Sequence, residues 1–559
     1  MGPDAVWVGR RNNAAQAPQR LIIFDVGVWL CVFLGLVALR LRPGLALTLG
    51  QDSFQYMSAA QNALDGHFGY TSLVHFDAER SFGVVPAPMV TFPPGYPLAL
   101  ALASLTGLPL ATSGLLISLI AMAACLPLLA WLGIRLGLSR VVYNAVLAGF
   151  ATNAAVNVVA ARVASDALFT AIVLFAIGLL VRRDRGKGST WNWVFAGIAF
   201  GLAYLVRYAA MFFIVGLVFV LIRHLLSSDR SMAKRYAIAL TVAGVAVLGG
   251  IARNIVLVGN WRGGNDKIVS NPISLVLVET VRGVNRLFLG PGSGVAGGTL
   301  FPRAVLLMSF AFGVAWLARH CVRKASLGRL AMLRNETASV GFDWSLLALA
   351  YIAGLIYAWL KSVISIGEER YLVPLLPLLL LLLGLTVQKL LSAAPERSRR
   401  LALLAFTISS ILYVYLNLLI LQLPQQPGWL PIAASLDARS TDGKSVRTAV
   451  YELTGADGTV MANSGQAIGY LLGRRTVSLV GPHFSSMEWT EQSMRETARR
   501  FGVRAIVIYA PTGDDRSTDG DVIPSTFVKS LAQGDAPPWM RLEYRASNFS
   551  VYALRAEGH

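Results

Sequence analysis

Long apolar runs fill the first three quarters of the chain, and short polar segments separate them. Runs of about 20 residues match the thickness of the hydrocarbon core of a bilayer. The pattern predicts eleven transmembrane helices, at 21–39, 112–134, 142–160, 166–181, 191–206, 209–223, 236–257, 301–318, 343–360, 371–388 and 401–423. A further apolar segment at 95–110 is shorter and is bounded by Pro and Gly, so it is predicted to be a partly embedded or surface helix.

The pattern changes beyond residue 424, where polar residues become frequent and short β-type runs alternate with helical ones. Strands are predicted at 459–462, 476–480, 505–509, 541–545 and 550–555, and helices at 466–472 and 490–501. The fold class is therefore a polytopic α-helical membrane protein with a C-terminal soluble α/β domain. The predicted divisions are a cytoplasmic segment (1–20), a transmembrane module (21–423) with its first outer loop at 40–111, and an extracytoplasmic domain (424–559).

Composition supports this class, because 55% of the 559 residues are hydrophobic, only 14% are charged, and the mean hydropathy is +0.58. The cysteines Cys31, Cys125 and Cys321 lie in or beside apolar spans, which argues against disulfides and thiolate zinc sites. The net charge of +19 comes from basic residues clustered next to apolar spans, as expected of anchors facing anionic lipid headgroups. Membrane lipids, and not nucleic acid, are the predicted partners of these charges.

Basic residues also predict which loops face the cytoplasm. Arg10, Arg11 and Arg20 place the N-terminus inside, and the first apolar run is expected to stay as an anchor. Every second loop after it carries a basic cluster, at 135–140, 182–187, 223–235, 319–334 and 389–400. An odd number of spans then puts the C-terminal domain on the outer face of the cytoplasmic membrane.

Charged residues outside those clusters gather on the predicted outer face, which is where we expect the chemistry. Asp52 follows the first span directly, and Asp166 opens a later one. Charges at a membrane boundary are costly to keep and commonly functional. Among the arginines of the outer loops, the candidate phosphate contacts are Arg162, Arg207, Arg253 and Arg370. Such a site could hold an anionic phosphate on arginines while a carboxylate accepts the proton of an acceptor hydroxyl.

Several motifs, in this order, resemble the GT-C superfamily of integral-membrane glycosyltransferases, especially the branch of protein O-mannosyltransferases and the lipid A aminoarabinose transferase. The resemblance covers about residues 20–425. Its motifs are Asp52-Ser-Phe-Gln-Tyr56, Phe92-Pro-Pro-Gly-Tyr96-Pro97, Ala164-Ser-Asp-Ala-Leu-Phe169, Gly197-Ile-Ala-Phe-Gly-Leu-Ala203 with Arg207, Arg253-Asn254, and Glu369-Arg-Tyr-Leu-Val-Pro-Leu-Leu-Pro377.

The resemblance implies transfer of a sugar from a polyprenyl-phosphate donor to a lipid, glycan or protein acceptor. By position, Asp52 corresponds to the aspartate at the reaction centre, and Asp166 to a second acidic residue near it. The aminoarabinose branch carries a lysine before its Pro-Pro pair, whereas this chain has Phe92. The arginines named above would therefore have to contact the donor phosphate, and Tyr56, Tyr96 and Tyr371 are the predicted aromatic contacts to substrate.

The expected chemistry is a single inverting displacement in which Asp52 is the general base. Arginines or a divalent ion could stabilise the leaving phosphate, so no cofactor is required, and His67 and His75 are the candidate extra ligands if a metal is used. Two other classes remain open. A transporter or lipid flippase would favour charges in mid-membrane helices and inverted repeats, and a non-enzymatic scaffold would leave Asp52 without a role.

Overall fold

A computed structural model describes residues 19–42, 49–75, 81–181, 190–263, 270–289, 337–361, 366–421, 430–481, 488–511 and 523–555. Its helices are α2 (Gln19–Leu41), α3 (Gln51–Leu64), α4 (Gly95–Ser104), α5 (Leu110–Arg135), α6 (Arg140–Ala151), α7 (Ala154–Ala160), α8 (Ser165–Leu180), α9 (Thr190–Val206), α10 (Ala210–Leu226), α11 (Arg230–Val258), α12 (Ile273–Leu289), α15 (Thr337–Lys361), η3 (Glu369–Tyr371), η4 (Val373–Leu375), α16 (Leu376–Ala393), α17 (Glu396–Leu421), α18 (Leu430–Ser435), α19 (Thr441–Thr454), α20 (Gly465–Leu472), α21 (Glu491–Arg500) and α22 (Thr526–Gln533). Its strands are β1 (Tyr70–Thr71), β2 (Leu73–Val74), β3 (Ala87–Pro88), β4 (Thr459–Ala462), β5 (Arg475–Ser478), β6 (Val503–Tyr509), β7 (Met540–Arg545) and β8 (Phe549–Leu554).

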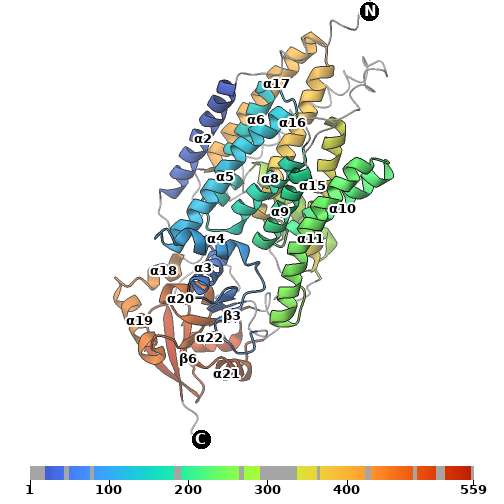
Figure 1. Ribbon diagram of the computed structural model, residues 1–559. Helices are drawn as coiled ribbons and strands as arrows, with labels where there is room; N and C mark the ends of the chain where they lie inside the picture. Colours follow the sequence, from blue (N-terminus) through green and yellow to red (C-terminus); the bar gives the residue numbers. More distant parts are fainter. Residues whose placement is uncertain are drawn as a thin grey trace, which may run out of the picture.

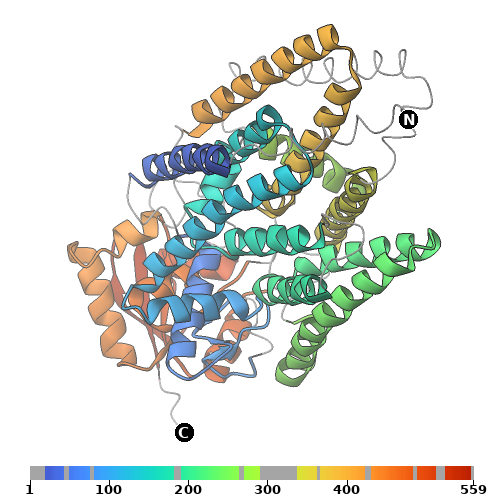
Figure 2. The ribbon, with the colours of Figure 1, turned by 45° about the horizontal axis from the view of Figure 1, so that its top comes forward.

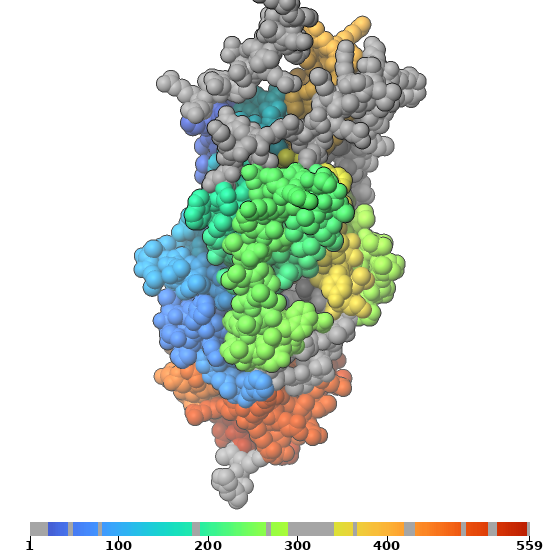
Figure 3. Space-filling model, turned by 45° about the vertical axis from the view of Figure 1, so that its right-hand side comes forward, coloured from blue at the N-terminus to red at the C-terminus, as the bar shows by residue number. Residues whose placement is uncertain are grey.

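The long apolar helices form one bundle, and the C-terminal α/β domain lies at one end of it (Figures 1 and 2). The first outer loop, with α3 and α4, lies where these two parts meet. The space-filling view shows the same order along the molecule, with blue first-loop residues next to the orange and red domain (Figure 3). The predicted class, a helical membrane protein with a C-terminal α/β domain, is confirmed.

Helices occur at ten of the eleven predicted spans, and the eleventh, 301–318, lies outside the described residues. Within the described ranges, six helices are long and apolar enough to cross a bilayer, and the bent pair of α6 and α7 makes a seventh if it counts as one span. Helices α8, α9 and α10 are apolar but have only 16 or 17 residues. The count of eleven spans stays a prediction.

Asparagines at the break between α6 and α7 compensate for the interrupted backbone. The two helices meet at 55°. Asn153 caps α7 by accepting a hydrogen bond from the amide of Val156, and its own amide donates to the carbonyl of Leu287 over 2.7 Å. Asn417 of α17 accepts from the amide of Ala154. Because unpaired backbone groups are costly in lipid, these side chains make the break tolerable.

Small residues allow α9 and α11 to pack closely. A Cβ added to Gly197 would lie 2.6 Å from the carbonyl oxygen of Ala239 and 2.7 Å from the Cβ of Val242. A side chain there would push the helices apart. Close packing through small residues is a common means of association in membranes, where burial of apolar surface between helices gains little. The glycine-rich motif predicted from sequence is therefore a helix contact.

The C-terminal domain contains a sheet that takes one strand from the first outer loop. Its order is β2-β5-β4-β6-β8-β7, with β2, β5, β4 and β6 parallel and β8 antiparallel to both β6 and β7. The edge strand β2 pairs Leu73 with Thr476. Because a hydrogen-bonded ladder cannot cross a bilayer, the first outer loop and the C-terminal domain lie on the same side of the membrane. The sheet thus extends beyond the segment 424–559 that the sequence predicted.

Candidate active site

Asp52 lies in the first turn of α3, the helix that opens the first outer loop. Ser53 accepts a hydrogen bond from the amide of Gly50 over 2.8 Å and donates to the carbonyl of Val163 over 2.7 Å. These contacts fix the start of α3 against the segment that leads into α8. They also bring Asp52 close to α8, the helix that carries Asp166. Asp52 lies at the N-terminal end of α3, where the helix dipole favours negative charge.

Arg370 joins two carboxylates at this point. Its Nη1 atom donates to Oδ2 of Asp52 over 2.7 Å, across 318 positions of sequence. Its Nε atom lies 2.9 Å from Oε1 of Glu368, a close ion pair that is not an aligned hydrogen bond. The Asp52 and Arg370 side chains are 23% and 22% exposed, so the pair is shielded but can still be reached from solvent.

The environment acts differently on the two carboxylates. Burial raises the pKa of Asp52, but the charge and hydrogen bond of Arg370 outweigh it and hold that pKa below its usual value. Burial also raises the pKa of Glu368, and there the opposing charge of Arg370 does not outweigh it. Two neighbouring carboxyl groups with pKa values shifted in opposite directions commonly mark an acid–base site.

A second ion pair lies beside the first. Nη1 of Arg207 is 2.9 Å from Oδ1 of the buried Asp166 and donates to Oγ of Ser165 over 3.1 Å. The hydroxyls of Ser165 and Tyr56 are 3.0 Å apart. Ser165 therefore connects Arg207 to α3, the helix that carries Asp52.

Tyr371 lies between the two arginines. Its ring centroid is 5.0 Å from the guanidinium carbon of Arg207 and 4.9 Å from that of Arg370, within the range of cation–π contacts. Its hydroxyl accepts from Nη2 of Arg370 over 3.1 Å. Asp52, Tyr56, Asp166, Arg207, Arg370 and Tyr371, all selected from the sequence, thus form one connected cluster.

Tyr96 adjoins the cluster through aromatic packing. The rings of Tyr96 and Phe92 each lie 4.9 Å from that of Tyr56, in edge-on arrangements. Phe92 therefore supports Tyr56 from the position where the aminoarabinose branch has its lysine. A Cβ on Gly95 would lie 2.5 Å from the carbonyl oxygen of Leu205, so this motif needs glycine for α4 to approach the end of α9.

The remaining two predicted arginines have different surroundings. Burial and the charge of Arg370 lower the pKa of Arg162, whose guanidinium makes no hydrogen bond or salt bridge to any described residue. The charge of Arg40, at the end of α2, interacts with that of Arg162. Arg253 instead donates to the carbonyls of Gly69 and Met89, over 3.2 and 2.9 Å. It therefore holds the backbone of the first outer loop, a role that the sequence did not suggest.

The two candidate metal ligands lie in unlike environments. His67 is exposed, whereas His75 is buried, and burial lowers the pKa of His75 to about 4 against the opposing charge of Asp52. His75 is thus neutral at physiological pH and near the reaction centre. No group of three or more His, Cys, Asp or Glu side chains that could hold a metal ion occurs among the residues that the structure describes.

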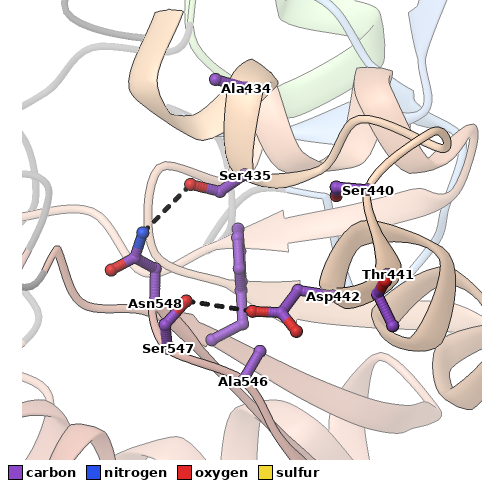
Figure 4. A pocket seen from close by; sticks show the side chains of 9 residues that line it. Ala434, Ser435, Ser440, Thr441, Asp442, Ala546, Ser547 and Asn548 are labelled. Carbon is purple, nitrogen blue, oxygen red and sulfur yellow. Dashed lines mark hydrogen bonds between the residues drawn. The ribbon is translucent and has the colours of Figure 1, made fainter.

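Sequence reasoning missed Ser165 and Glu368 as site residues. Ser165 directly precedes Asp166, and Glu368 lies two positions before Arg370, but neither was distinguished from its neighbours by its spacing. A polar hollow of about 230 Å³ in the C-terminal domain is a different case (Figure 4). Ser547 donates to Asp442 and Asn548 to Ser435 there, over 3.0 and 3.1 Å. These groups satisfy one another and join the β7–β8 turn to α18 and α19.

Comparison with known proteins bears on the family and the fold. The family described as dolichyl-phosphate-mannose-protein mannosyltransferase matches residues 92–249. A search of curated proteins finds no match.

Three solved structures share the fold. ArnT from Cupriavidus metallidurans in the apo state has a TM-score of 0.50 at 13% identity, over 96% of this chain and 98% of that one. The archaeal oligosaccharyltransferase AglB from Archaeoglobus fulgidus, in complex with an inhibitory peptide and a dolichol-phosphate, has a TM-score of 0.56 at 13% identity, over 88% and 69%. The arabinofuranosyltransferase AftD from Mycobacteria has a TM-score of 0.53 at 16% identity. The match covers 97% of this chain but only 40% of the AftD chain. The chain therefore shares its fold with these membrane enzymes, and residues 92–249 match the mannosyltransferase family, in agreement with the GT-C resemblance of its motifs.

Proposed function

We propose that this protein transfers a sugar from a polyprenyl-phosphate carrier to a hydroxyl acceptor at the outer face of the cytoplasmic membrane. The observation that carries the proposal is the cluster in which Arg370 joins Asp52 to Glu368 and Arg207 pairs with Asp166. The cluster lies where the first outer loop meets the helical bundle, so a lipid-linked donor in the bilayer could reach it. The resemblance to the GT-C superfamily supports a lipid-linked donor in general.

In the proposed reaction, the acceptor oxygen attacks the anomeric carbon while its proton passes to a carboxylate. The bond from the anomeric carbon to the phosphate oxygen breaks, and one displacement inverts the configuration. Asp52 is the proposed base. Its lowered pKa keeps it ionised and makes it a modest base, so its gain in strength must come from the approach of substrate to Arg370. A donor phosphate that draws Arg370 away from Asp52 would raise the basicity of Asp52 at the moment of reaction.

The arginines are proposed to stabilise the leaving phosphate, whose negative charge grows as the glycosidic bond breaks. Arg162 is the leading candidate for donor contact, because no described residue forms a salt bridge with it. Arg207 is engaged with Asp166, so its proposed role is to orient Tyr371 and Ser165 around Asp52. Arg253 is not proposed to contact the phosphate, because its guanidinium already donates to two carbonyls of the first outer loop.

The test is a transfer assay with purified protein in proteoliposomes. Undecaprenyl-phosphate mannose, aminoarabinose and arabinofuranose are supplied in turn, with an envelope extract as acceptor, and release of undecaprenyl phosphate is measured. Asp52→Asn should lose release at unchanged protein levels. Asp65→Asn is the matched control, because Asp65 ends the same helix but is exposed, and its carboxylate accepts a hydrogen bond from Gln61. Equal activity of wild type and Asp52→Asn would refute the assignment, and movement of a donor or solute without transfer would replace it with transport.

A further inference from the structure

A cleft of about 480 Å³ in the C-terminal domain is lined by four arginines and, among the described residues, by no acidic side chain. Its arginines are Arg495, Arg499, Arg504 and Arg555, and Trp539 completes the polar lining. The volume is in the range of small-ligand sites. The cleft is separate from the cluster around Asp52, and no step of the proposed reaction uses it.

The arginines are segregated, since the domain as a whole is not basic. Residues 424–559 contain 14 Lys and Arg against 14 Asp and Glu. A random surface of such a domain would mix the two signs. Arg504 and Arg555 are exposed and form no salt bridge to any described residue, so their charge is available to a ligand. Trp539 donates its indole N–H to Glu491 over 2.9 Å, which fixes the ring at the edge of the cleft.

The position of the cleft in the sheet sets which ligands can reach it. The carboxyl ends of the parallel strands face the membrane module. Helix α20, which follows β4, packs on α3, and the rings of Phe54 and Tyr470 in this contact are 5.0 Å apart. The cleft lies at the other end of the sheet, where β6 begins at Val503 and β8 ends at Leu554. Helix α21 lies at this end of the domain, away from the transmembrane bundle (Figure 1). The cleft therefore lies at the end of the sheet that points away from the helical bundle.

We propose that this cleft binds an anionic glycan, through carboxylate or phosphate groups on successive sugars, as part of the acceptor. Guanidinium groups recognise both anions through paired hydrogen bonds, and a fixed indole ring offers a face for a sugar to stack on. That the glycan is the acceptor rests on the proposed function. Binding of the glycan to the cleft, however, needs neither the donor nor sugar transfer. A glycan held here would extend outward from the membrane while its reacting end approaches Asp52.

The experiment measures binding of the full-length protein in nanodiscs to an oligogalacturonate and to a phosphodiester-linked mannose oligomer of equal charge, with dextran as the neutral glycan. We expect at least one anionic glycan to bind, dextran to bind at least tenfold more weakly, and the affinity to fall with added salt. The double variant R504Q/R555Q should lose at least tenfold in affinity. Arg541→Gln is the matched control, because Arg541 is exposed on the same domain but paired with Glu543 outside the cleft.

Unchanged binding by R504Q/R555Q, or an equal loss in Arg541→Gln, would overturn the proposal. So would single-stranded DNA of equal charge binding as tightly as the glycans, since this indicates a general polyanion surface. Asp52→Asn should bind glycan like wild type while losing transfer. If wild type binds glycan but no transfer is found, the proposed function fails and the cleft remains; if transfer occurs without glycan binding, only the cleft assignment fails.

Discussion

Replacement of Arg370 by glutamine is the sharpest test of the reaction centre. Asp52 and Glu368 lie 2.7 and 2.9 Å from this guanidinium, so the variant removes two charge contacts at once and leaves a shorter, neutral polar side chain. Hydrogen bonds to charged groups contribute about 1.5–3 kcal/mol each. Only the contact with Asp52 is an aligned hydrogen bond, so we expect a loss of about 1.5–3 kcal/mol in total. This loss corresponds to a fall of roughly 10- to 150-fold in kcat/KM at neutral pH.

The pH profile shows whether the loss acts through Asp52. Burial alone raises the pKa of Asp52, and Arg370 is the main opposing cause, so its removal shifts that pKa upward. A base works only when ionised. The acidic limb of the kcat/KM profile should therefore move to higher pH in Arg370→Gln, and raising the pH should restore part of the activity. Transfer is assayed from pH 3 to 9 with each donor that wild type uses, because the acidic limb of wild type lies below pH 5.

The free energy of unfolding should also be lower in Arg370→Gln than in wild type at neutral pH. A carboxyl whose folded pKa is lowered contributes stability above its unfolded pKa, and this contribution is lost as pH falls through the folded pKa. The contribution of Asp52 is therefore present at neutral pH in wild type and absent in Arg370→Gln. Arg282→Gln is the control, since the Arg282 side chain is 64% exposed and its pair with Glu279 should contribute little. An acidic limb that does not move, together with full activity at neutral pH, would refute the reasoning.

Three further changes test the surroundings of the site and the bundle. Ser165→Ala removes the hydroxyl that Arg207 and Tyr56 share. Since a hydrogen bond to a charged group is lost, kcat should fall about tenfold at unchanged protein levels. Unaltered kcat would show that Ser165 does not position the cluster. Asn153→Ala leaves the amide of Val156 without its cap and the carbonyl of Leu287 without its donor, and should lower the free energy of unfolding by about 1–3 kcal/mol. The measurement is thermal unfolding in detergent, with Asn192→Ala, an exposed asparagine of α9 outside the break, as comparison. Gly197→Val should destabilise by about 1–3 kcal/mol through overpacking against α11, whereas Gly244→Ala, where a Cβ meets nothing within 4 Å, should be tolerated; equal melting temperatures of these two variants would contradict the close contact of α9 and α11.

The sequence alone determined the class of protein and most of its helices. Apolar runs long enough to cross a bilayer are local features, and no distant contact is needed to find them. The strands β4, β5, β6, β7 and β8 were also predicted within a few residues, because their β-type runs are bounded by turn residues. Helices α12, α19 and α22 were missed, since their charged or polar residues are equally typical of loops.

Asp52, Asp166 and the arginines could be selected from sequence because charges at a membrane boundary are rare and costly. Their pairing could not. Only the folded chain brings Arg370 to Asp52, assigns Arg207 to Asp166, turns Arg253 toward loop carbonyls, and adds β2 from the first loop to the C-terminal sheet. Solvation of a segment depends on its own composition, whereas a salt bridge or a ladder depends on where two distant segments meet, and that is set by the packing of the whole bundle.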